Sequence, residues 1–229
     1  MSASFVIPEP RRSVLPIHGA DGLFPVRRVY CVGRNYAAHA REMGADPDRE
    51  PPFFFSKPGD AVVPGGQIPY PPATADLHHE VELVVAIGRT GTAVRPAEAQ
   101  ALIYGFAVGV DLTRRDLQTE AKKGGKPWDM AKGFDNSAPV GALVPLDAYP
   151  LPEAAAIILD VDGQRRQAGD LADMIWSVPE VIAHLSGLVT LEPGDLIFTG
   201  TPEGVGPLER GAVVRAEVAG LPLLAFTLV

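Results

Sequence analysis

The chain has a single cysteine, Cys31, and therefore cannot form an internal disulfide. Cys31 lies in the apolar run at residues 29–32, which is typical of a buried structural thiol rather than of a nucleophile. No apolar run is as long as a membrane span, and the N-terminal residues contain no signal-peptide core. We therefore expect a cytoplasmic protein that does not bind a membrane.

Positive charge is also scarce. The 229 residues carry 20 Lys and Arg against 28 Asp and Glu, which gives a net charge of −8. This balance argues against nucleic acid and anionic membranes as partners. The glycine-rich segment at residues 199–206 is neither a Walker loop, because no Gly-Lys-Ser/Thr follows, nor a dinucleotide fingerprint, because its glycines are wrongly spaced.

What the sequence does contain is an ordinary share of core-forming residues, 46% hydrophobic and 21% charged. Its 24 glycines and 23 prolines are dispersed, which favours many short strands joined by tight turns. We predict an α+β, β-rich fold, with an irregular N-terminal extension at residues 1–25 and a single catalytic domain at residues 26–229. A doubly wound parallel sheet is the lesser alternative, because strands and helices do not alternate regularly.

Helices are predicted at four places by composition and capping residues. Asn35 is a candidate N-cap for a short helix over residues 36–43, and Thr113 for a helix over residues 113–123. The other two are expected over residues 96–104 and, interrupted at Pro179, over residues 170–185.

The most informative segment is the predicted strand at residues 77–87. Side chains on a strand alternate between its faces, so Val81 and Leu83 share one face and Glu80 and Glu82 share the other, about 6–7 Å apart. Val84 follows on the acidic face, which indicates that this face is buried. Two unneutralised carboxylates would be costly there, and a divalent cation would compensate them. The alternative is a solvated strand end with two surface acids.

Asp111 ends the apolar strand expected at residues 106–110. By itself it is most simply a strand terminator. Together with Glu80 and Glu82 it completes a three-carboxylate set that could hold one divalent ion and leave positions open for substrate or water.

His39 and Glu42 are spaced i, i+3 on a predicted helix, so their side chains are neighbours. Such a pair can act as a general base toward water, although an exposed helix with one salt-bridging acid is the alternative. Lys57 and Lys132 each interrupt an apolar or tight segment and could bind an anionic substrate or stabilise an enolate, with surface lysines as the alternative. Thr201 offers a hydroxyl and an N–H group to a carboxylate.

Taken in order, five segments of the chain resemble the motifs of the fumarylacetoacetate hydrolase family, and the resemblance runs from about Arg28 to the C-terminus. The segments are VGRNYAAHAREM at 32–43, HEVEL at 79–83, DLTRRDLQ at 111–118, KPWDMAK at 126–132 and TGTP at 199–202. Because 229 residues are too few to include the extra N-terminal domain of the fumarylacetoacetase enzyme proper, we expect the chain to resemble the short acylpyruvase and fumarylpyruvate hydrolase branch.

The resemblance implies a mixed β-sandwich roll with short helices and a lid, usually a homodimer. It implies Mg²⁺ or Mn²⁺ as the cofactor and a small oxo-diacid as the substrate. The residue roles that it implies are Glu80, Glu82 and Asp111 as metal ligands, His39 and Glu42 as the water-activating dyad, and Arg34, Lys57, Arg115, Gln118, Lys132 and Thr201 as the lining of the substrate site.

The expected function is therefore the hydrolysis of a C–C bond in 2,4-dioxo acids, with fumarylpyruvate as the candidate substrate, in aromatic catabolism. Lys132 is expected to act in catalysis by stabilising the enolate. Decarboxylation of oxaloacetate and isomerisation of a hydroxymuconate-type diacid are the alternatives on the same site. A non-enzymatic metal-binding β-domain is the alternative from another class.

Overall fold

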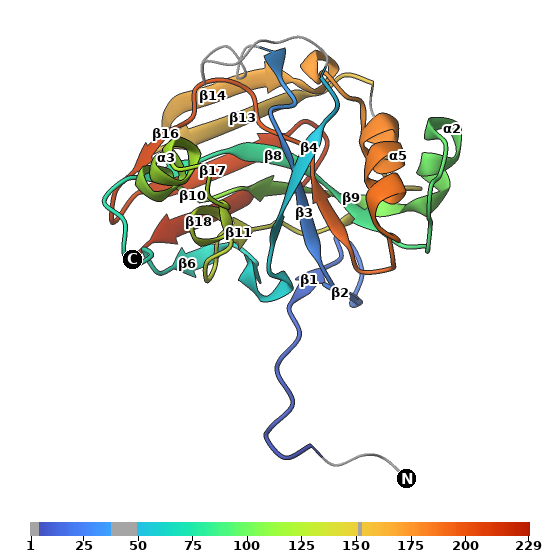
Figure 1. The fold of residues 1–229 in the computed structure, drawn as a ribbon, viewed down its shortest axis with the longest axis horizontal. Coiled ribbons are helices and arrows are strands. Elements are labelled where there is room, and N and C mark those ends of the chain that lie inside the picture. The colour runs from blue at the N-terminus through green and yellow to red at the C-terminus, as the bar shows by residue number, and fades with distance from the viewer. Residues whose placement is uncertain (1–4, 38–49, 151–152) are drawn as a thin grey trace.

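Two β-sheets packed face to face form the core of the computed structural model, which describes residues 5–37, 50–150 and 153–229 (Figure 1). One sheet consists of β3 (Val29–Gly33), β4 (Phe53–Lys57), β8 (Val81–Ile87), β9 (Ile103–Val110), β12 (Val144–Pro145) and β15 (Leu196–Phe198). The other consists of β6 (Gly66–Ile68), β13 (Ala156–Val161), β14 (Gln164–Asp170), β17 (Val213–Val218) and β18 (Leu224–Leu228). The strand orders are β12-β9-β8-β15-β3-β4 and β14-β13-β17-β18-β6.

Shorter strands and helices surround the two sheets. The remaining strands are β1 (Val14–Pro16), β2 (Leu23–Pro25), β5 (Val62–Val63), β7 (Leu77–His79), β10 (Thr113–Arg114), β11 (Ala138–Pro139) and β16 (Gly206–Leu208). The helices are α2 (Pro96–Ala99), α3 (Arg115–Lys123), α4 (Asp129–Lys132) and α5 (Val178–Leu188), with 3₁₀ turns η1 (Gly59–Ala61), η2 (Gln100–Leu102) and η3 (Leu171–Asp173). This architecture confirms the predicted α+β, β-rich class.

Strand β8 lies in the interior of its sheet, between β9 and β15, and all of its residues are buried. Val81, Leu83 and Val85 belong to the core between the two sheets, whereas Val84 and Ala86 pack into a second core on the other side of the six-stranded sheet. The predicted alternation of faces is therefore confirmed. The predicted strand is divided at Glu80, because β7 leaves this sheet and pairs with β10 and β16 instead.

Two predicted helices are shorter than expected because strands take part of their residues. The segment 96–104 contains only α2 and η2 before β9 begins at Ile103. The helix expected from Thr113 begins at Arg115, because Thr113 belongs to β10 and pairs with His78. Its hydroxyl accepts a hydrogen bond from Lys132 rather than capping the helix.

The helix expected over residues 170–185 begins eight residues later, at Val178. Strand β14 continues to Asp170, whose side chain caps η3 by accepting from the N–H group of Ala172. Pro179 lies in the first turn of α5, where a missing N–H group costs no helical hydrogen bond. Ser177 and Glu180 form a capping box, so the proline marks the start of this helix rather than an interruption.

Asn35 joins two distant segments at the end of β3. Its amide donates to the carbonyl oxygens of Thr199, at 2.7 Å, and Trp176, at 2.9 Å, and its oxygen accepts from the Trp176 N–H group. The prediction that Asn35 also caps a helix stays a prediction. Most of that predicted helix, residues 38–43, lies outside the described residues.

Residues 14–25 form an antiparallel hairpin of β1 and β2, and its buried side chains Leu15 and Phe24 belong to the second core. Before β1 the chain runs away from the two sheets (Figure 1). Among the helices that the structure describes, none has both the length and the hydrophobicity needed to cross a membrane.

Gly109 lies opposite Glu82 in the pairing of β9 with β8. A substitution at this position therefore tests how tightly the strands beneath the acidic residues are packed. A Cβ atom there would lie 2.5 Å from Val84 Cγ2 and 2.8 Å from Phe198 Cε1. We expect Gly109→Ala to lower the free energy of unfolding by about 1–3 kcal/mol, as overpacking of a core does.

The matched control is Gly187→Ala in α5, where an added Cβ meets nothing within 4 Å. Because alanine stabilises a helix interior more than glycine does, we expect the free energy of unfolding of this variant to rise by about 0.5–1 kcal/mol. Urea unfolding measures both changes. Equal stability of the two variants would contradict close packing at Gly109.

Candidate metal centre and active site

Three buried carboxylates meet where strand β8 begins and strand β9 ends. Glu80 lies between β7 and β8, Glu82 is the second residue of β8, and Asp111 directly follows β9. The pairing of Val81 with Val110 places these segments side by side, and the Asp111 N–H group donates to the Glu80 carbonyl at 2.8 Å. One ligand oxygen of each carboxylate lies within 4.8 Å of the others. The sequence prediction that these acids converge in the interior is confirmed.

Lys132, the last residue of α4, lies between two of these carboxylates. Its Nζ is 2.8 Å from Glu80 Oε2, 2.6 Å from Asp111 Oδ2 and 2.7 Å from Thr113 Oγ1. Burial disfavours the charge of this ammonium, but Asp111 and Glu80 outweigh burial and raise the pKa of Lys132. Lys132 is therefore a permanently charged group inside the site.

Lys57, at the end of β4, contacts the cluster from another side. Its Nζ is 2.7 Å from Asp111 Oδ1 and donates to the carbonyl oxygens of Leu112 (3.1 Å), Ser137 (3.0 Å) and Lys132. Because three carbonyls take its protons, Asp111 Oδ1 has an ion-pair contact but accepts no hydrogen bond within the described structure. Lys57 thus connects β4 with the chain that follows β9 and α4.

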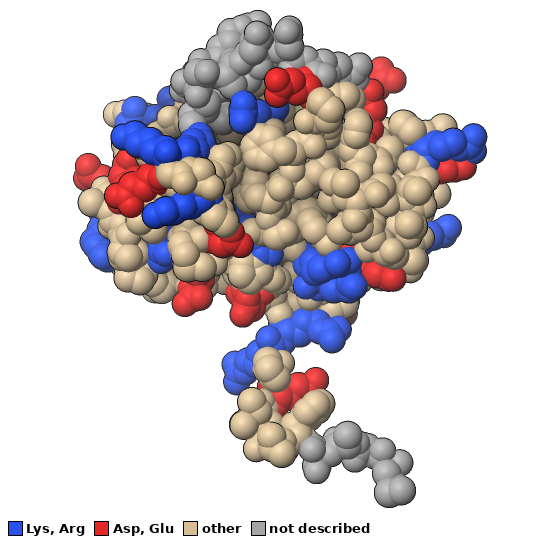
Figure 2. Space-filling model, viewed as in Figure 1, with Lys and Arg blue, Asp and Glu red and all other residues tan. Residues whose placement is uncertain are grey.

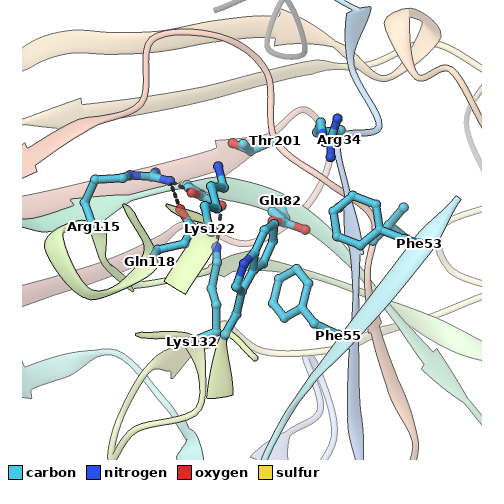
Figure 3. Close-up of a pocket in the computed structure, with 13 residues that line it drawn as sticks. Arg34, Phe53, Phe55, Glu82, Arg115, Gln118, Lys122, Lys132 and Thr201 are labelled. Atoms are coloured by element: carbon cyan, nitrogen blue, oxygen red, sulfur yellow. Dashed lines mark hydrogen bonds and ion pairs between the residues drawn. The ribbon is translucent and has the colours of Figure 1, made fainter. Parts of the chain in front are cut away.

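Arg115 begins α3 and contacts the third side of the cluster. Its guanidinium donates to Glu80 Oε1 and to Gln118 Oε1, both at 2.5 Å. Gln118 lies one helical turn further along α3, so the two side chains face the same way. The helix therefore presents to Glu80 a charged arginine that a neutral glutamine holds in place, and Figure 3 shows Arg115 and Gln118 side by side.

Glu82 differs from the other two acids because no basic side chain forms an ion pair with it within the described structure. Its Oε2 accepts the Gly200 N–H group at 2.6 Å. Burial, with the neighbouring charges of Asp111 and Glu80, raises the pKa of the Glu82 carboxyl well above its usual range. Gly200 has a φ of +97° and approaches Asn35 closely, since an added Cβ would lie 2.6 Å from the Asn35 Cβ, so only glycine fits here.

These residues fit a divalent cation. Hard cations bind carboxylate oxygens, and Asp111 Oδ1 accepts no hydrogen bond while Glu82 has no cationic partner within the described residues. From the sequence alone, a metal is expected to compensate all of the buried acids. The structure shows that basic side chains compensate two of the three. Lys57, Lys132 and Arg115 already compensate Glu80 and Asp111, so Glu82 is the acid that most needs a metal.

A cavity of about 40 Å³ lies over the carboxylates (Figure 3). The residues that line it are Val32, Gly33, Arg34, Phe53, Phe55, Glu80, Glu82, Arg115, Gln118, Lys122, Trp128, Lys132 and Thr201. A second cavity, of about 450 Å³, shares Phe53, Phe55, Trp128 and Lys132 with the first and is otherwise lined by residues 54, 56, 126, 127 and 129. The two cavities therefore have aromatic walls in common.

Most of the predicted site residues lie around this cavity. Those that line it are Glu80, Glu82, Arg34, Arg115, Gln118, Lys132 and Thr201. Asp111 lies behind them, in contact with Lys132, and Lys57 contacts Asp111 without lining the cavity. His39 and Glu42 lie outside the described residues, so their roles stay predictions.

Sequence reasoning missed several polar residues that hold the site together. Gln167 is fully buried in β14, and its Oε1 lies 2.9 Å from His79 Nδ1. Burial lowers the pKa of His79 to about 4, so this ring is neutral where it contacts Gln167. Ser137, whose hydroxyl donates to the Lys132 carbonyl, was also missed. Only the folded structure reveals these long-range partners.

Residues 28–229 match the family model described as fumarylacetoacetate (FAA) hydrolase C-terminal, and the chain belongs to this family. The crystal structure of fumarylpyruvate hydrolase from Pseudomonas aeruginosa in complex with Mn²⁺ and pyruvate is 51% identical and covers 99% of both chains, with a TM-score of 0.97. The human mitochondrial oxaloacetate tautomerase FAHD1 is 44% identical over 201 residues, which cover 87% of this chain and 90% of the relative.

A third relative carries another activity in its name. The structure of 5-carboxymethyl-2-hydroxymuconate delta-isomerase from Mycobacterium smegmatis is 34% identical, covers 94% of this chain and 79% of its own, and has a TM-score of 0.80. The family and its fold are therefore shown for this chain, whereas its relatives are named for a hydrolase, a tautomerase and an isomerase.

Metal binding can be tested without an activity assay. At a Mn²⁺ concentration about 100 times its Kd, binding to the native state adds about 2.7 kcal/mol to the free energy of unfolding. For a chain of this length, that increase raises the Tm by roughly 5–10 °C. We expect Glu82→Gln to abolish this rise and to leave the metal-free Tm unchanged or higher, because the amide oxygen still accepts the Gly200 N–H group and a buried charge is removed.

The matched control for this variant is Glu120→Gln, an exposed acid in α3, which should keep the full rise in Tm. Differential scanning fluorimetry with and without Mn²⁺ measures both. A Glu82→Gln variant that Mn²⁺ stabilises as strongly as wild type would show that Glu82 is not a ligand.

Proposed function

We propose that this chain is a divalent-metal-dependent hydrolase that cleaves acylpyruvates, with fumarylpyruvate as substrate, into pyruvate and a carboxylic acid. The observation that carries the proposal is the buried acidic triad beside Lys132 and Arg115. It is supported by 51% identity, over nearly the whole chain, to a fumarylpyruvate hydrolase whose crystal structure contains Mn²⁺ and pyruvate. Either Mg²⁺ or Mn²⁺ suits an all-oxygen ligand set.

Binding of the 2-oxo acid end of the substrate is assigned to side chains that line the 40 Å³ cavity. Arg115 offers a guanidinium, a geometry that matches a carboxylate, and Thr201 offers a hydroxyl. Glu80, Glu82 and Asp111 would hold the cation. Bound there, a divalent cation supplies polarisation of a carbonyl oxygen and stabilisation of negative charge.

The chemical step is the addition of water followed by C–C cleavage. His39, oriented by Glu42, takes a proton from water, and the hydroxide adds to the carbonyl carbon distal to the 2-oxo acid. The bond between that carbon and C3 of the pyruvate part then breaks, and its electron pair stays on the pyruvate enolate. Lys132 stabilises this enolate as a fixed positive charge, and protonation at C3 yields pyruvate. The distal part leaves as the carboxylic acid.

Oxaloacetate tautomerisation is the second candidate, favoured by the 44% identity to the human tautomerase. Moving a proton between C3 and the 2-oxo group of oxaloacetate develops the same kind of enolate and requires no water attack. The cluster around Lys132 would stabilise that enolate equally well, so this cluster does not discriminate between the two reactions.

A substrate panel distinguishes the candidates. With Mg²⁺ or Mn²⁺ present, we expect the largest kcat/KM for pyruvate release from fumarylpyruvate, followed by acetylpyruvate and maleylpyruvate, and only slow decarboxylation or keto–enol conversion of oxaloacetate. Pyruvate is quantified with a coupled assay, and the conversion of oxaloacetate is followed by its ultraviolet absorbance. Rapid conversion of oxaloacetate without pyruvate release from any acylpyruvate would overturn the proposal.

The rim of the cavity supports a substrate with a second carboxylate. Arg34 and Lys122 line the cavity, and neither forms an ion pair with an acid within the described part of the chain. Each lies over an aromatic ring instead, Arg34 at 5.1 Å from Phe53 and Lys122 at 5.2 Å from Trp128. Partial burial and the charge of Arg115 lower the pKa of Lys122. An anionic end group would relieve this repulsion between cations, and fumarylpyruvate has one whereas acetylpyruvate does not.

Lys122→Met tests this assignment, since it removes the charge and keeps the length of the side chain. We expect the KM for fumarylpyruvate to rise about fivefold, as loss of a partly exposed ion pair implies, with no change in the KM for acetylpyruvate. Lys123→Met is the matched control, because Lys123 is exposed on the same helix and does not line the cavity. An equal rise for both substrates would contradict a role for Lys122 in binding the second carboxylate. Basic side chains are visible over α3 in Figure 2.

A further inference from the structure

Gln167 is fully buried in β14, and its neighbours fix which end of its amide is oxygen. One end faces the Val81 N–H group at 3.1 Å, which can only donate, so that end is Oε1. The other end faces the Pro202 carbonyl at 2.9 Å, which can only accept, so that end is the amino group. Two backbone groups therefore determine the amide orientation independently of any side chain.

The fixed amide determines the direction of the Thr201 hydroxyl. The second N–H of the Gln167 amino group donates to Thr201 Oγ1 at 2.8 Å, so Thr201 is the acceptor in this bond. A hydroxyl that accepts still has a proton to donate. No acceptor for that proton lies among the residues that the structure describes, and Thr201 lines the cavity over the carboxylates. Its proton is therefore available to a ligand in that cavity.

The remaining contact of Gln167 fixes the amide further. Oε1 accepts from His79 Nδ1 at 2.9 Å as well as from Val81, so both acceptor positions of the amide oxygen are filled. Val81 lies between the two proposed metal ligands Glu80 and Glu82. Gln167 thus connects the strand of the acidic residues with the loop of Thr201, from a sheet that does not itself line the cavity.

We propose that Gln167 is a positioning residue that holds the Thr201 hydroxyl as a donor to a carboxylate oxygen of the bound 2-oxo acid. This inference rests on the proposed function only for the class of ligand. The bond from Thr201 would be present equally in the bound substrate and in the transition state. Its loss should therefore raise KM and leave kcat nearly unchanged.

Gln167→Glu tests the proposal with a side chain of the same shape. An ionised carboxylate has no proton to give, so the Thr201 hydroxyl would donate to the introduced carboxylate and no longer to the ligand. We expect the Kd for pyruvate, measured by calorimetry in the presence of Mn²⁺, to rise about 10- to 100-fold, as loss of a hydrogen bond to a charged group implies. Pyruvate binding is read without turnover, so this result does not depend on whether the chain is a hydrolase or a tautomerase.

A double-mutant cycle with Thr201→Val separates positioning from general damage. If Gln167 acts through the hydroxyl, Gln167→Glu should add almost nothing to the rise in Kd already caused by Thr201→Val. Thr201→Ser keeps the hydroxyl and should bind pyruvate nearly as wild type. If the rises in Kd of the two single variants multiplied in full in the double variant, the proposal would be overturned. An unchanged Kd in Gln167→Glu would also overturn it.

A buried carboxylate can prevent folding, so Gln167→Met serves as the second variant. It removes the donor to Thr201 without adding a charge. We expect a rise in Kd of about threefold or more, which again should disappear in the Thr201→Val background. The Tm rise with Mn²⁺ confirms in each variant that the acidic site is intact. If Gln167→Met binds pyruvate as wild type does, the hydroxyl needs no positioning by Gln167 and the proposal fails.

Discussion

The structure of this site depends on the mutual compensation of buried charges. Glu80 and Asp111 are each paired with two basic side chains, and Lys132 contacts both. Removing one partner of a buried pair leaves an uncompensated charge and typically costs about 3–5 kcal/mol, whereas an exposed pair contributes almost nothing. The ends of β4, β9 and α4 must therefore meet for these charges to be compensated. Formation of the site is thus coupled to folding of the chain.

Glu82 is the exception to this compensation. Its carboxylate has a backbone N–H group for a partner but forms no ion pair with a basic side chain among the described residues, and burial raises its pKa. The protein could have compensated Glu82 with another lysine, as it does for Asp111. Without a basic partner for Glu82, the empty site is less stable than a fully compensated one would be. The same lack of a partner favours binding of a divalent ion. This arrangement of buried charges suits one further cation.

Much of this arrangement could be predicted from the sequence, and the reason is local. The alternation in residues 81–87 placed Glu82 opposite Val81 and Leu83, because strand geometry alone determines which side chains share a face. The family motifs brought Asp111 and Lys132 into the same site. By contrast, Gln167 and Ser137 act through partners that lie outside their own sequence motifs, so no local pattern shows them. The start of α5 was misplaced because Pro179 suits a first turn as well as a helix break.

The buried cluster by itself does not determine which reaction takes place. C–C cleavage of an acylpyruvate, proton removal from C3 of oxaloacetate and loss of the C4 carboxylate of oxaloacetate would each develop an enolate next to a carboxylate. In the proposed mechanism Lys132 is the fixed charge that stabilises this enolate in each case. What differs is the size of the substrate and the need to activate water. In the proposed function, substrate size would be recognised at the aromatic and basic rim formed by Phe53, Trp128 and Lys122, because a long diacid would contact both the buried cluster and a second cation. Specificity in this chain is therefore expected to depend on the rim, while the interior supplies the chemistry common to all three reactions.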